Sequence, residues 1–398
     1  MNLISRIKQS SRELILFAIA VMALGMAFSM IDAITNNFLN AKFVLTGFQR
    51  SFLEIPRELP GFLVVFFSAG LWFLCSRRLG VVAMIFSAAG AVLVGFASSS
   101  YTLIPIWLFI SSIGFHLYMP LAATIGMELA REGQDGRRLG QINSIRNLAA
   151  VLGSFSVVLG FKYFGFTFQH TFAIAAVLLG IAAVLLFMMT PEPVIEKRGF
   201  LQLHKEYRLF YILNVLSGAR KQLFLTFAPW VLVSILKQPT QLMATLFTIG
   251  GVIGILFQPL LGWAIDKFGE RMVLASEAVV LVFVCFGYGF AKFMFPVDTA
   301  FLVVCACFLI DQMIFSVSMA RATYMKKIAL QPDHIQSALT AAVTIDHFFS
   351  ITAALLGGVI WNVFGFQYVF LLGMLIAVIN FFVALRVRLP QKITNRIG

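Results

Sequence analysis

The sequence predicts an all-α membrane protein, with twelve transmembrane helices in two pseudo-symmetric six-helix bundles. Hydrophobic residues make up 60% of the chain and charged residues only 12%, and the mean hydropathy is +0.93. A soluble domain could not bury this much apolar surface, whereas a helix of about 20 apolar residues spans a bilayer. The net charge of +13 lies in short loops rather than in one patch or tail, which argues against nucleic-acid binding.

The first apolar run, from Leu14 to Ile31, is too long for the core of a signal peptide and long enough to span the membrane. Ser10 and Glu13 have the spacing of a capping box, so we expect the first helix to begin near them. Further apolar runs follow along the whole chain. The predicted spans are 14–38, 46–75, 80–99, 102–130, 139–163, 167–189, 208–234, 240–264, 271–290, 298–325, 336–361 and 366–388.

The lysines and arginines in and near the loops alternate in number along the chain. With the N-terminus inside, 20 of them lie on the cytoplasmic side and 5 on the outer side. Cytoplasmic loops carry the excess of Lys and Arg, so both termini are predicted to be cytoplasmic in a multi-pass protein of the inner membrane. The outer five are Lys42, Arg50, Lys162, Lys237 and Lys292.

The two halves of the chain resemble each other. Phe164–Phe168 reads Phe-Gly-Phe-Thr-Phe, and Phe364–Tyr368, 200 residues later, reads Phe-Gly-Phe-Gln-Tyr. Two six-helix halves in parallel orientation fit a duplicated transporter bundle. We therefore predict an N-terminal bundle at 1–190, a cytoplasmic linker at 191–207 and a C-terminal bundle at 208–398.

A charged decapeptide, Gly262–Arg271, lies between two apolar runs and predicts a tight, solvent-facing turn. Its Gly262, Asp266, Lys267, Gly269 and Arg271 resemble the loop motif G-x-x-x-D-[RK]-x-G-[RK]-[RK] of the major facilitator superfamily. Together with the twelve spans, the two halves and the cytoplasmic linker, this resemblance covers essentially the whole chain. It implies that the first, fourth, seventh and tenth spans line a central cavity, with alternating access by rocking of the bundles. It also implies that the second, fifth, eighth and eleventh spans form the bundle contacts, while the others face lipid.

The resemblance implies a cytoplasmic gate at this motif. Asp266, flanked by Lys267 and Arg271, would lie over the start of the fifth span and could meet Arg137 or Arg138.

The corresponding loop of the first half carries Arg77 and Arg78 in place of an acid. A cation there would oppose the start of the eleventh span, where Asp333 lies. We therefore expect Arg77 or Arg78 to pair with Asp333 at less than about 8 Å, because screening weakens pairing beyond that distance.

Ionisable residues inside the spans are the candidates for function, because each costs on the order of 2.5–3.5 kcal/mol at mid-membrane. Asp32 and Asn36 in the first span are four residues apart and share one helix face. We expect Asp32 to carry a proton during transport and Asn36 to line the cavity. The alternative is that Asp32 is a structural hydrogen-bond anchor.

The second span holds the densest charged cluster, Glu54, Arg57 and Glu58, with Pro56 and Pro60 interleaved. The spacing predicts that Arg57 pairs with Glu54 and that both acids lie on one face. The prolines predict a kink. Glu54 and Glu58 are further proton candidates with Arg57 at the cavity, and the alternative is an ion-paired kink that only holds helices together.

Other candidates for the substrate cavity are His116 and Tyr118 in the fourth span, and Arg146 in the fifth. Asp346 and His347 in the eleventh span lie 200 residues after Arg146 and Asn147, so duplication predicts a similar depth. For His116 the alternative is a packed polar side chain without a ligand.

Arg220 and Lys221 in the seventh span are adjacent cations, and Asp311 is an acid in the tenth. Either cation could pair with Asp311 or hold an anionic group of a substrate, since arginine offers a planar fork for carboxylate or phosphate.

Motifs for other functions are missing from the sequence. It holds no phosphate-binding glycine loop, metal-spaced His/Cys set or nucleophile elbow, so we expect neither enzyme activity, nor a cofactor, nor a metal site. The missing glycine loop also argues against an ATP-driven pump. We predict a monomeric secondary transporter in the lipid bilayer that moves a small polar or anionic organic solute with protons. The alternatives are an exporter of amphipathic compounds, or a sensor or lipid scramblase that does not transport.

Overall fold

The computed structural model describes residues 3–71, 73–130, 135–191 and 203–388, and all regular structure within these ranges is helical. The chain forms two compact units. Unit 1 comprises Met1–Arg198 and Pro229–Ile255, and unit 2 comprises Gly199–Ala228 and Leu256–Gly398. Within the described residues, nine helical stretches are long and apolar enough to cross a membrane. One of them contains two predicted spans, so the count of twelve and the location of the termini stay predictions.

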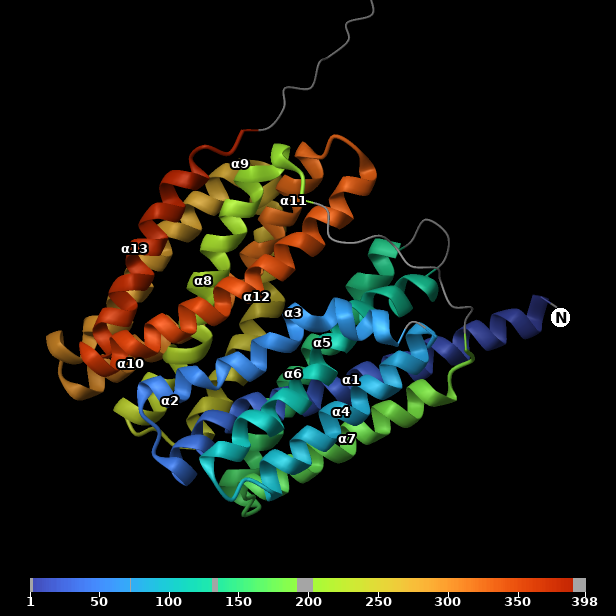
Figure 1. Ribbon diagram of the computed structural model, residues 1–398, viewed down its shortest axis with the longest axis horizontal. Coiled ribbons are helices and arrows are strands. Elements are labelled where there is room, and N and C mark those ends of the chain that lie inside the picture. The colour runs from blue at the N-terminus through green and yellow to red at the C-terminus, as the bar shows by residue number, and fades with distance from the viewer. Residues whose placement is uncertain (1–2, 72, 131–134, 192–202, 389–398) are drawn as a thin grey trace, which may run out of the picture. The chain divides into compact units, whose positions relative to one another are not determined.

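Unit 1 consists of long helices that pack side by side. In it α4 lies against α5 and α7, while α1 lies against α6 and α7 (Figure 1). Its elements from the N-terminal part of the chain are α1 (Leu3–Phe43), α2 (Gly47–Phe52), α3 (Glu54–Gly70), α4 (Ser76–Phe96), η1 (Tyr101–Leu103), α5 (Ile104–Glu128), α6 (Asp135–Tyr163) and α7 (Phe168–Met188).

The segment Pro229–Ile255 belongs to unit 1 because it bonds to helices of that unit. The Asn37 side chain in α1 donates to the Gln238 carbonyl at 2.9 Å, and Thr248 donates to the Ser154 hydroxyl of α6 at 2.9 Å. This segment includes the π-helical η3 (Val231–Ile235) and the first part of α9 (Thr240–Met294). The units thus divide this part of the chain differently from the two predicted halves, whose boundaries stay a prediction.

Unit 2 contains the remaining helices. Its elements are η2 (Lys205–Tyr207), α8 (Arg208–Trp230) up to Ala228, α9 from Leu256 onward, α10 (Val297–Ile314), η4 (Phe315–Val317), α11 (Ser318–Ile328), α12 (Pro332–Val363) and α13 (Phe366–Ala384). The buried aromatic and aliphatic side chains of α8, α9, α11 and α12, among them Phe210, Leu274 and Ala338, form its core.

The predicted turn in Gly262–Arg271 is confirmed. Gly269 has φ +80° and ψ 161°, which interrupts α9 and separates its two helical parts. Only glycine adopts this conformation without strain. Asp266, Lys267 and Arg271 are exposed around it, as a solvent-facing turn requires.

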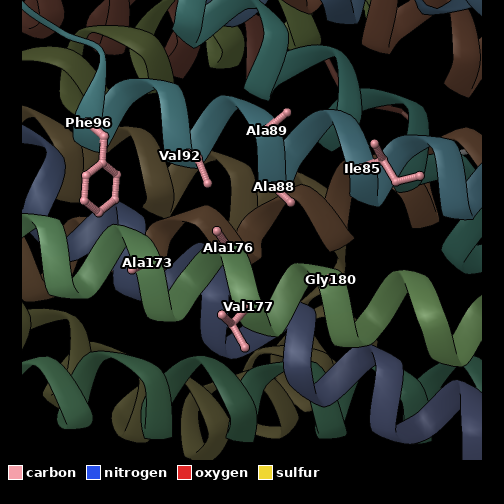
Figure 2. Close-up of a pocket in the computed structure, with 9 residues that line it drawn as sticks. All are labelled: Ile85, Ala88, Ala89, Val92, Phe96, Ala173, Ala176, Val177 and Gly180. Carbon is pink, nitrogen blue, oxygen red and sulfur yellow. The ribbon is translucent and has the colours of Figure 1, made fainter.

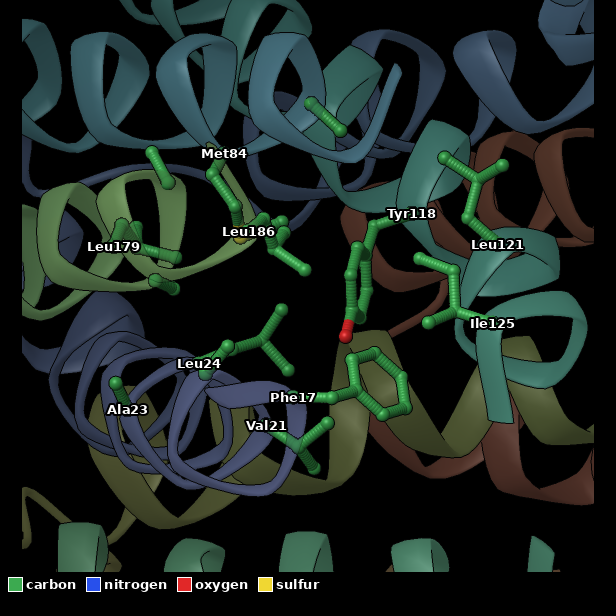
Figure 3. Packing of buried hydrophobic residues seen from close by; sticks show 14 of the residues in the cluster. Phe17, Val21, Ala23, Leu24, Met84, Tyr118, Leu121, Ile125, Leu179 and Leu186 are labelled. Carbon is green, nitrogen blue, oxygen red and sulfur yellow. The ribbon is translucent and has the colours of Figure 1, made fainter. Parts of the chain in front are cut away.

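The hydrophobic core of unit 1 gathers side chains from five helices, α1, α4, α5, α6 and α7. Phe17 and Leu24 of α1 lie near Tyr118 of α5 and Leu186 of α7, and all four are less than 6% exposed (Figure 3). α4 and α5 approach closely at Gly114, which has no Cβ. A Cβ at this position would overlap Ser87 and the carbonyl of Ala83. Such contact between small residues is a common way to pack helices in a membrane.

The expected start of the first helix near Ser10 and Glu13 is wrong, because α1 begins at Leu3. Glu13 does not cap it. Its carboxylate instead accepts hydrogen bonds from the backbone N–H and hydroxyl of Thr190, both at 3.1 Å. The Glu13 side chain, which the local pattern assigned to a helix cap, therefore bonds to Thr190 at the other end of the N-terminal half.

The predicted irregularity of the second span is present, at Leu53, where α2 ends and α3 begins. Pro56 is the third residue of α3, and its ring leaves no room for a helical carbonyl at Phe52. Pro60 lies inside α3 without ending it. Across the break, Arg50 of α2 pairs with Glu54 of α3.

Candidate functional site

Glu54 is the centre of a buried charged cluster in unit 1. Its Oε1 accepts from Arg50 Nη1 at 2.5 Å and from Arg57 Nη1 at 3.0 Å. Arg50 Nε donates in turn to Asn36 Oδ1 at 2.9 Å. We call Asn36, Arg50, Glu54 and Arg57 the acid-centred network, because one carboxylate lies between two guanidinium groups. It confirms the predicted Glu54–Arg57 pair.

Arg50 is a residue that the sequence analysis missed. Its position near the end of an apolar run placed it among the outer loop charges, yet it is only 1% exposed, as is Glu54. Glu54 follows four residues later, so the i, i+4 spacing was a usable signal. The pair was missed because Arg50 was counted as an outer charge, although the predicted span 46–75 contains both residues.

Asp32 lies one turn before Asn36 on α1 and is exposed. It is close enough to Arg57 and Glu54 to interact with both electrostatically. Glu58, half-buried on α3, also interacts with Arg57. An accessible acid thus adjoins a buried ion pair, so that a proton gained or lost at Asp32 would change the charge balance around Arg57.

The start of α3 is held by α5 as well. The Ser112 hydroxyl donates to the carbonyl of Arg57 and lies 3.0 Å from His116 Nδ1. His116 is buried, with 7% of its surface exposed. Tyr118 lies in the hydrophobic core of unit 1 (Figure 3), whereas Arg146 on α6 is exposed. Their roles at a substrate cavity stay predictions.

Unit 2 holds the reverse arrangement, one arginine between two acids. Arg220 Nη1 on α8 donates to Asp311 Oδ1 on α10 at 2.9 Å, and Arg220 Nη2 lies 3.7 Å from Glu277 Oε1 on α9. The other oxygen of Glu277 accepts from Arg321 Nη1 on α11 at 3.3 Å. These four residues are the arginine-centred network. Its Arg220–Asp311 contact confirms one of the pairings that the sequence left open.

All four members of this network are buried, and none is more than 7% exposed. The Arg220 guanidinium also lies 5.6 Å from the ring centroids of Phe224 and Phe315, within the range of cation–π interaction. Carboxylates and aromatic faces therefore replace the water that a buried guanidinium loses.

The sequence analysis also missed Glu277. It lies in the predicted span 271–290, which the family resemblance turns towards lipid, and it was not assigned a role. The usable signal was an acid inside an apolar run, since such residues face the interior of a bundle and have partners.

A second ion pair lies next to the arginine-centred network. Lys221 on α8 pairs with Asp346 on α12. Asp346 packs directly against Gly218, where a Cβ would overlap its Oδ1. His347, the next residue on α12, is buried. The two cations predicted to hold an anionic substrate thus both have acid partners.

Arg77 and Arg78, which the sequence predicts to be cytoplasmic, have partners inside unit 1. Arg77 Nη1 lies 3.3 Å from Glu13 Oε2 and also donates to the Thr190 carbonyl, while Arg77 Nη2 lies 3.9 Å from Glu128. Arg78 donates to the Phe187 carbonyl at 2.5 Å and stacks on the Phe187 ring at 4.3 Å. The side chain of Asp333 lies outside the described residues, so its pairing with either arginine stays a prediction.

The turn at Gly269 has contacts within unit 2. Lys267 Nζ lies 4.6 Å from the Trp263 ring centroid, and Glu270, 1% exposed, pairs with Lys327 at 2.6 Å. In unit 1 Arg138 donates to Gln141 at 2.9 Å. The side chain of Arg137 lies outside the described residues. A gate formed by Asp266, Lys267 and Arg271 therefore stays a prediction.

An apolar groove of about 510 Å³ runs between α4 and α7 on unit 1 (Figure 2). Its described lining is entirely apolar and offers no side chain that would hydrogen-bond a polar solute. These helices are the third and sixth spans, which the family resemblance turns towards lipid. The lining residues are Ile85, Ala88, Ala89, Val92, Phe96, Ala173, Ala176, Val177 and Gly180.

Comparisons with known proteins agree with this architecture. The model of the Major Facilitator Superfamily matches residues 14–345 and 210–397. No curated protein matches the chain significantly.

Several solved structures share the fold. The nucleoside transporter NupG aligns with a TM-score of 0.74 and 14% identity, covering 94% of this chain and 98% of that chain. The xylose transporter XylE from E. coli aligns with a TM-score of 0.66 and 15% identity, covering 94% and 98%. A POT family transporter in complex with 5-aminolevulinic acid aligns with a TM-score of 0.71 and 11% identity, covering 94% and 95%. At these identities the similarity shows the fold alone.

Proposed function

Because the chain belongs to the major facilitator superfamily, a family of membrane transporters, we propose that it is a proton-coupled secondary transporter of a small polar or anionic organic solute. It acts as a monomer in the cytoplasmic membrane, with both termini in the cytoplasm, twelve spans in two six-helix bundles, and alternating access. The charged decapeptide at Gly262–Arg271 acts in cytoplasmic gating.

The observation that supports proton coupling best is the position of Asp32. It is exposed on α1 and interacts electrostatically with Arg57 and Glu54 of the buried acid-centred network. An ionisable residue inside a membrane span requires a partner or a function. Asp32 can exchange a proton with water, and the change reaches the network that joins α1, α2 and α3.

The cations narrow the class of solute. Arg220 and Lys221 have acid partners, and Arg57 pairs with Glu54. The exposed Arg146 is therefore the candidate for contact with an anionic group. A neutral polar solute does not need this cation. Comparing neutral with anionic solutes in Arg146→Ala therefore separates the two classes, because only anionic solutes should show a raised KM.

The test is uptake by proteoliposomes under an imposed pH gradient. The solute panel includes a nucleoside, xylose and 5-aminolevulinic acid, which the solved structures of the same fold suggest. We expect accumulation that collapses when an ionophore removes the gradient, and that is lost in Asp32→Asn. Asp298→Asn is the matched control, because Asp298 is exposed in the first turn of α10.

Four outcomes would contradict the proposal in different ways. Accumulation that does not need the gradient excludes proton coupling. Gradient-driven accumulation that survives Asp32→Asn removes Asp32 as the coupling acid. Lipid movement between leaflets without movement of any solute would instead identify a scramblase, and efflux confined to amphipathic compounds would identify an exporter.

A further inference from the structure

We propose that Asp311 is the proton-binding carboxylate of unit 2, and that Glu277 is the positioning residue that holds Arg220 while Asp311 is protonated. This inference rests on the proposed proton coupling and extends it to a pair of acids outside the N-terminal helices. It gives Glu277, which the sequence analysis left without a role, a function in the transport cycle.

The geometry of Arg220 is asymmetric. Its Nη1 makes a hydrogen bond of 2.9 Å to Asp311, while its Nη2 lies 3.7 Å from Glu277 Oε1, too far for one. Within the described residues, Arg220 Nε and Glu277 Oε1 are both buried without a hydrogen-bond partner. Arg220 Nε can therefore still donate a hydrogen bond and Glu277 Oε1 can still accept one. A small shift of the guanidinium would join Arg220 to Glu277.

The charge balance shows why Asp311 can take up a proton. With both acids ionised, two carboxylates neutralise Arg220 and Arg321. When Asp311 binds a proton from water, it gives up its ionic bond with Arg220, and Glu277 remains between the two arginines. No guanidinium is then left without a counter-ion, which is the outcome that a buried pair must avoid. Release of the proton to water restores the original pairing.

The partners of Glu54 are arranged differently. Among the described hydrogen bonds, Arg50, which is 1% exposed, has Glu54 as its carboxylate partner and Asn36 as a neutral one. Asp32, Glu54 and Glu58 stay the proton candidates of unit 1.

The groups around Asp311 come from several helices. Arg220 reaches it from α8 and Glu277 from α9, and Arg321 of α11 lies beyond Glu277. The phenol of Tyr288 and the thiols of Cys285 and Cys307 lie near Asp311 and carry no charge in their ordinary form at neutral pH. The titratable and charged groups that interact with Asp311 directly or through the network are Arg220, Glu277, Cys285, Tyr288, Cys307 and Arg321.

The first experiment compares accumulation with exchange in proteoliposomes. Exchange of labelled for unlabelled solute needs no net proton movement. We expect Asp311→Asn to keep exchange and to lose gradient-driven accumulation by about tenfold or more, a typical size for coupling between two bound species. Asp298→Asn is again the control. Unchanged accumulation in Asp311→Asn would overturn the proposal.

The role of Glu277 is tested by the pH profile of accumulation. In Glu277→Gln, Arg220 keeps Asp311 but loses its second carboxylate, which favours the ionised form of Asp311. We therefore expect the pH of half-maximal accumulation to fall by about one unit. Glu277→Asp, which keeps the charge, should largely restore the profile. A residue that only supports the fold would change the amount of active protein and leave the profile in place. An unshifted profile in Glu277→Gln therefore excludes the positioning role.

A measurement on the purified protein separates failure of this inference from failure of the proposed function. Infrared difference spectra between acid and neutral pH should show a carboxylic-acid C=O band that is absent from Asp311→Asn and present in Asp298→Asn. If Asp311→Asn does not fold, Asp311→Glu should keep the band at an altered frequency. The same band in Asp311→Asn as in wild type would overturn the assignment. A wild-type protein that shows the band but moves no solute would leave the proton site standing and remove the transport proposal.

Discussion

The two units bury their charges in opposite ways. In unit 1 one carboxylate, Glu54, lies between Arg50 and Arg57. In unit 2 one guanidinium, Arg220, lies between Asp311 and Glu277. The central group of each cluster serves two partners, so removing its charge leaves two like charges together. An outer group can lose its charge while the central group keeps another partner. The difference indicates which acids are structural and which are free to exchange protons.

Removing the central acid of unit 1 is the strongest test of this comparison. Glu54→Gln leaves Arg50 and Arg57 without a carboxylate at that point, and breaking a buried ion pair destabilises by about 3–5 kcal/mol. We expect a large fall in the midpoint of thermal unfolding of the purified protein in detergent. Glu206→Gln is the matched control, because Glu206 is exposed. A midpoint equal to that of the control would show that the network contributes little to stability.

Removing an outer acid of unit 2 should be milder. In Asp311→Asn, Arg220 retains Glu277 and the faces of Phe224 and Phe315. We expect a loss of about 1.5–3 kcal/mol, which corresponds to one hydrogen bond to a charged group. Thermal unfolding under the same conditions measures it. If Asp311→Asn is as damaging as Glu54→Gln, the distinction between central and outer groups is wrong.

The ion pair beside the arginine-centred network depends on a glycine. A methyl group at Gly218 would overlap the carboxylate of Asp346 and displace it from Lys221. We expect Gly218→Ala to destabilise by about 1–3 kcal/mol, as overpacking does. Gly180→Ala is the control, because nothing lies within 4 Å of a Cβ at that position. Equal unfolding midpoints for the two variants would mean that Asp346 moves aside without losing its partner.

The smallest expected effect concerns the support of the acid-centred network by α5. Ser112→Ala removes the hydrogen bond to the Arg57 carbonyl and the contact with His116. We expect a loss of about 0.5–1.5 kcal/mol, the net value of an ordinary hydrogen bond. Ser99→Ala, at an exposed position, is the comparison. A loss as large as that of Glu54→Gln would place His116, rather than the arginines, at the centre of the stability of unit 1.

The candidate site was partly visible in the sequence. The Glu54–Arg57 pair follows from i, i+3 spacing on one helix. The Arg220–Asp311 pair was one of the pairings that the sequence left open. Arg50 was missed because it was counted as a charge of the outer side, although it lies four residues before Glu54. Glu277 escaped because its helix was assigned to lipid by analogy, and a single acid on such a helix has no local partner to reveal it.

The sequence by itself determined that the chain is helical, lies in a membrane and has a family loop motif, because hydropathy, charge distribution and short-range spacing are local properties. The φ of +80° at Gly269 lies where the glycine of that motif predicted a turn. Only the tertiary structure decided which charges share a partner. Arg220, Glu277, Asp311 and Arg321 come from four helices, and helix rotation, which no local pattern specifies, brings them together. In a medium without water to solvate them, those contacts decide whether a buried acid stays ionised or exchanges a proton.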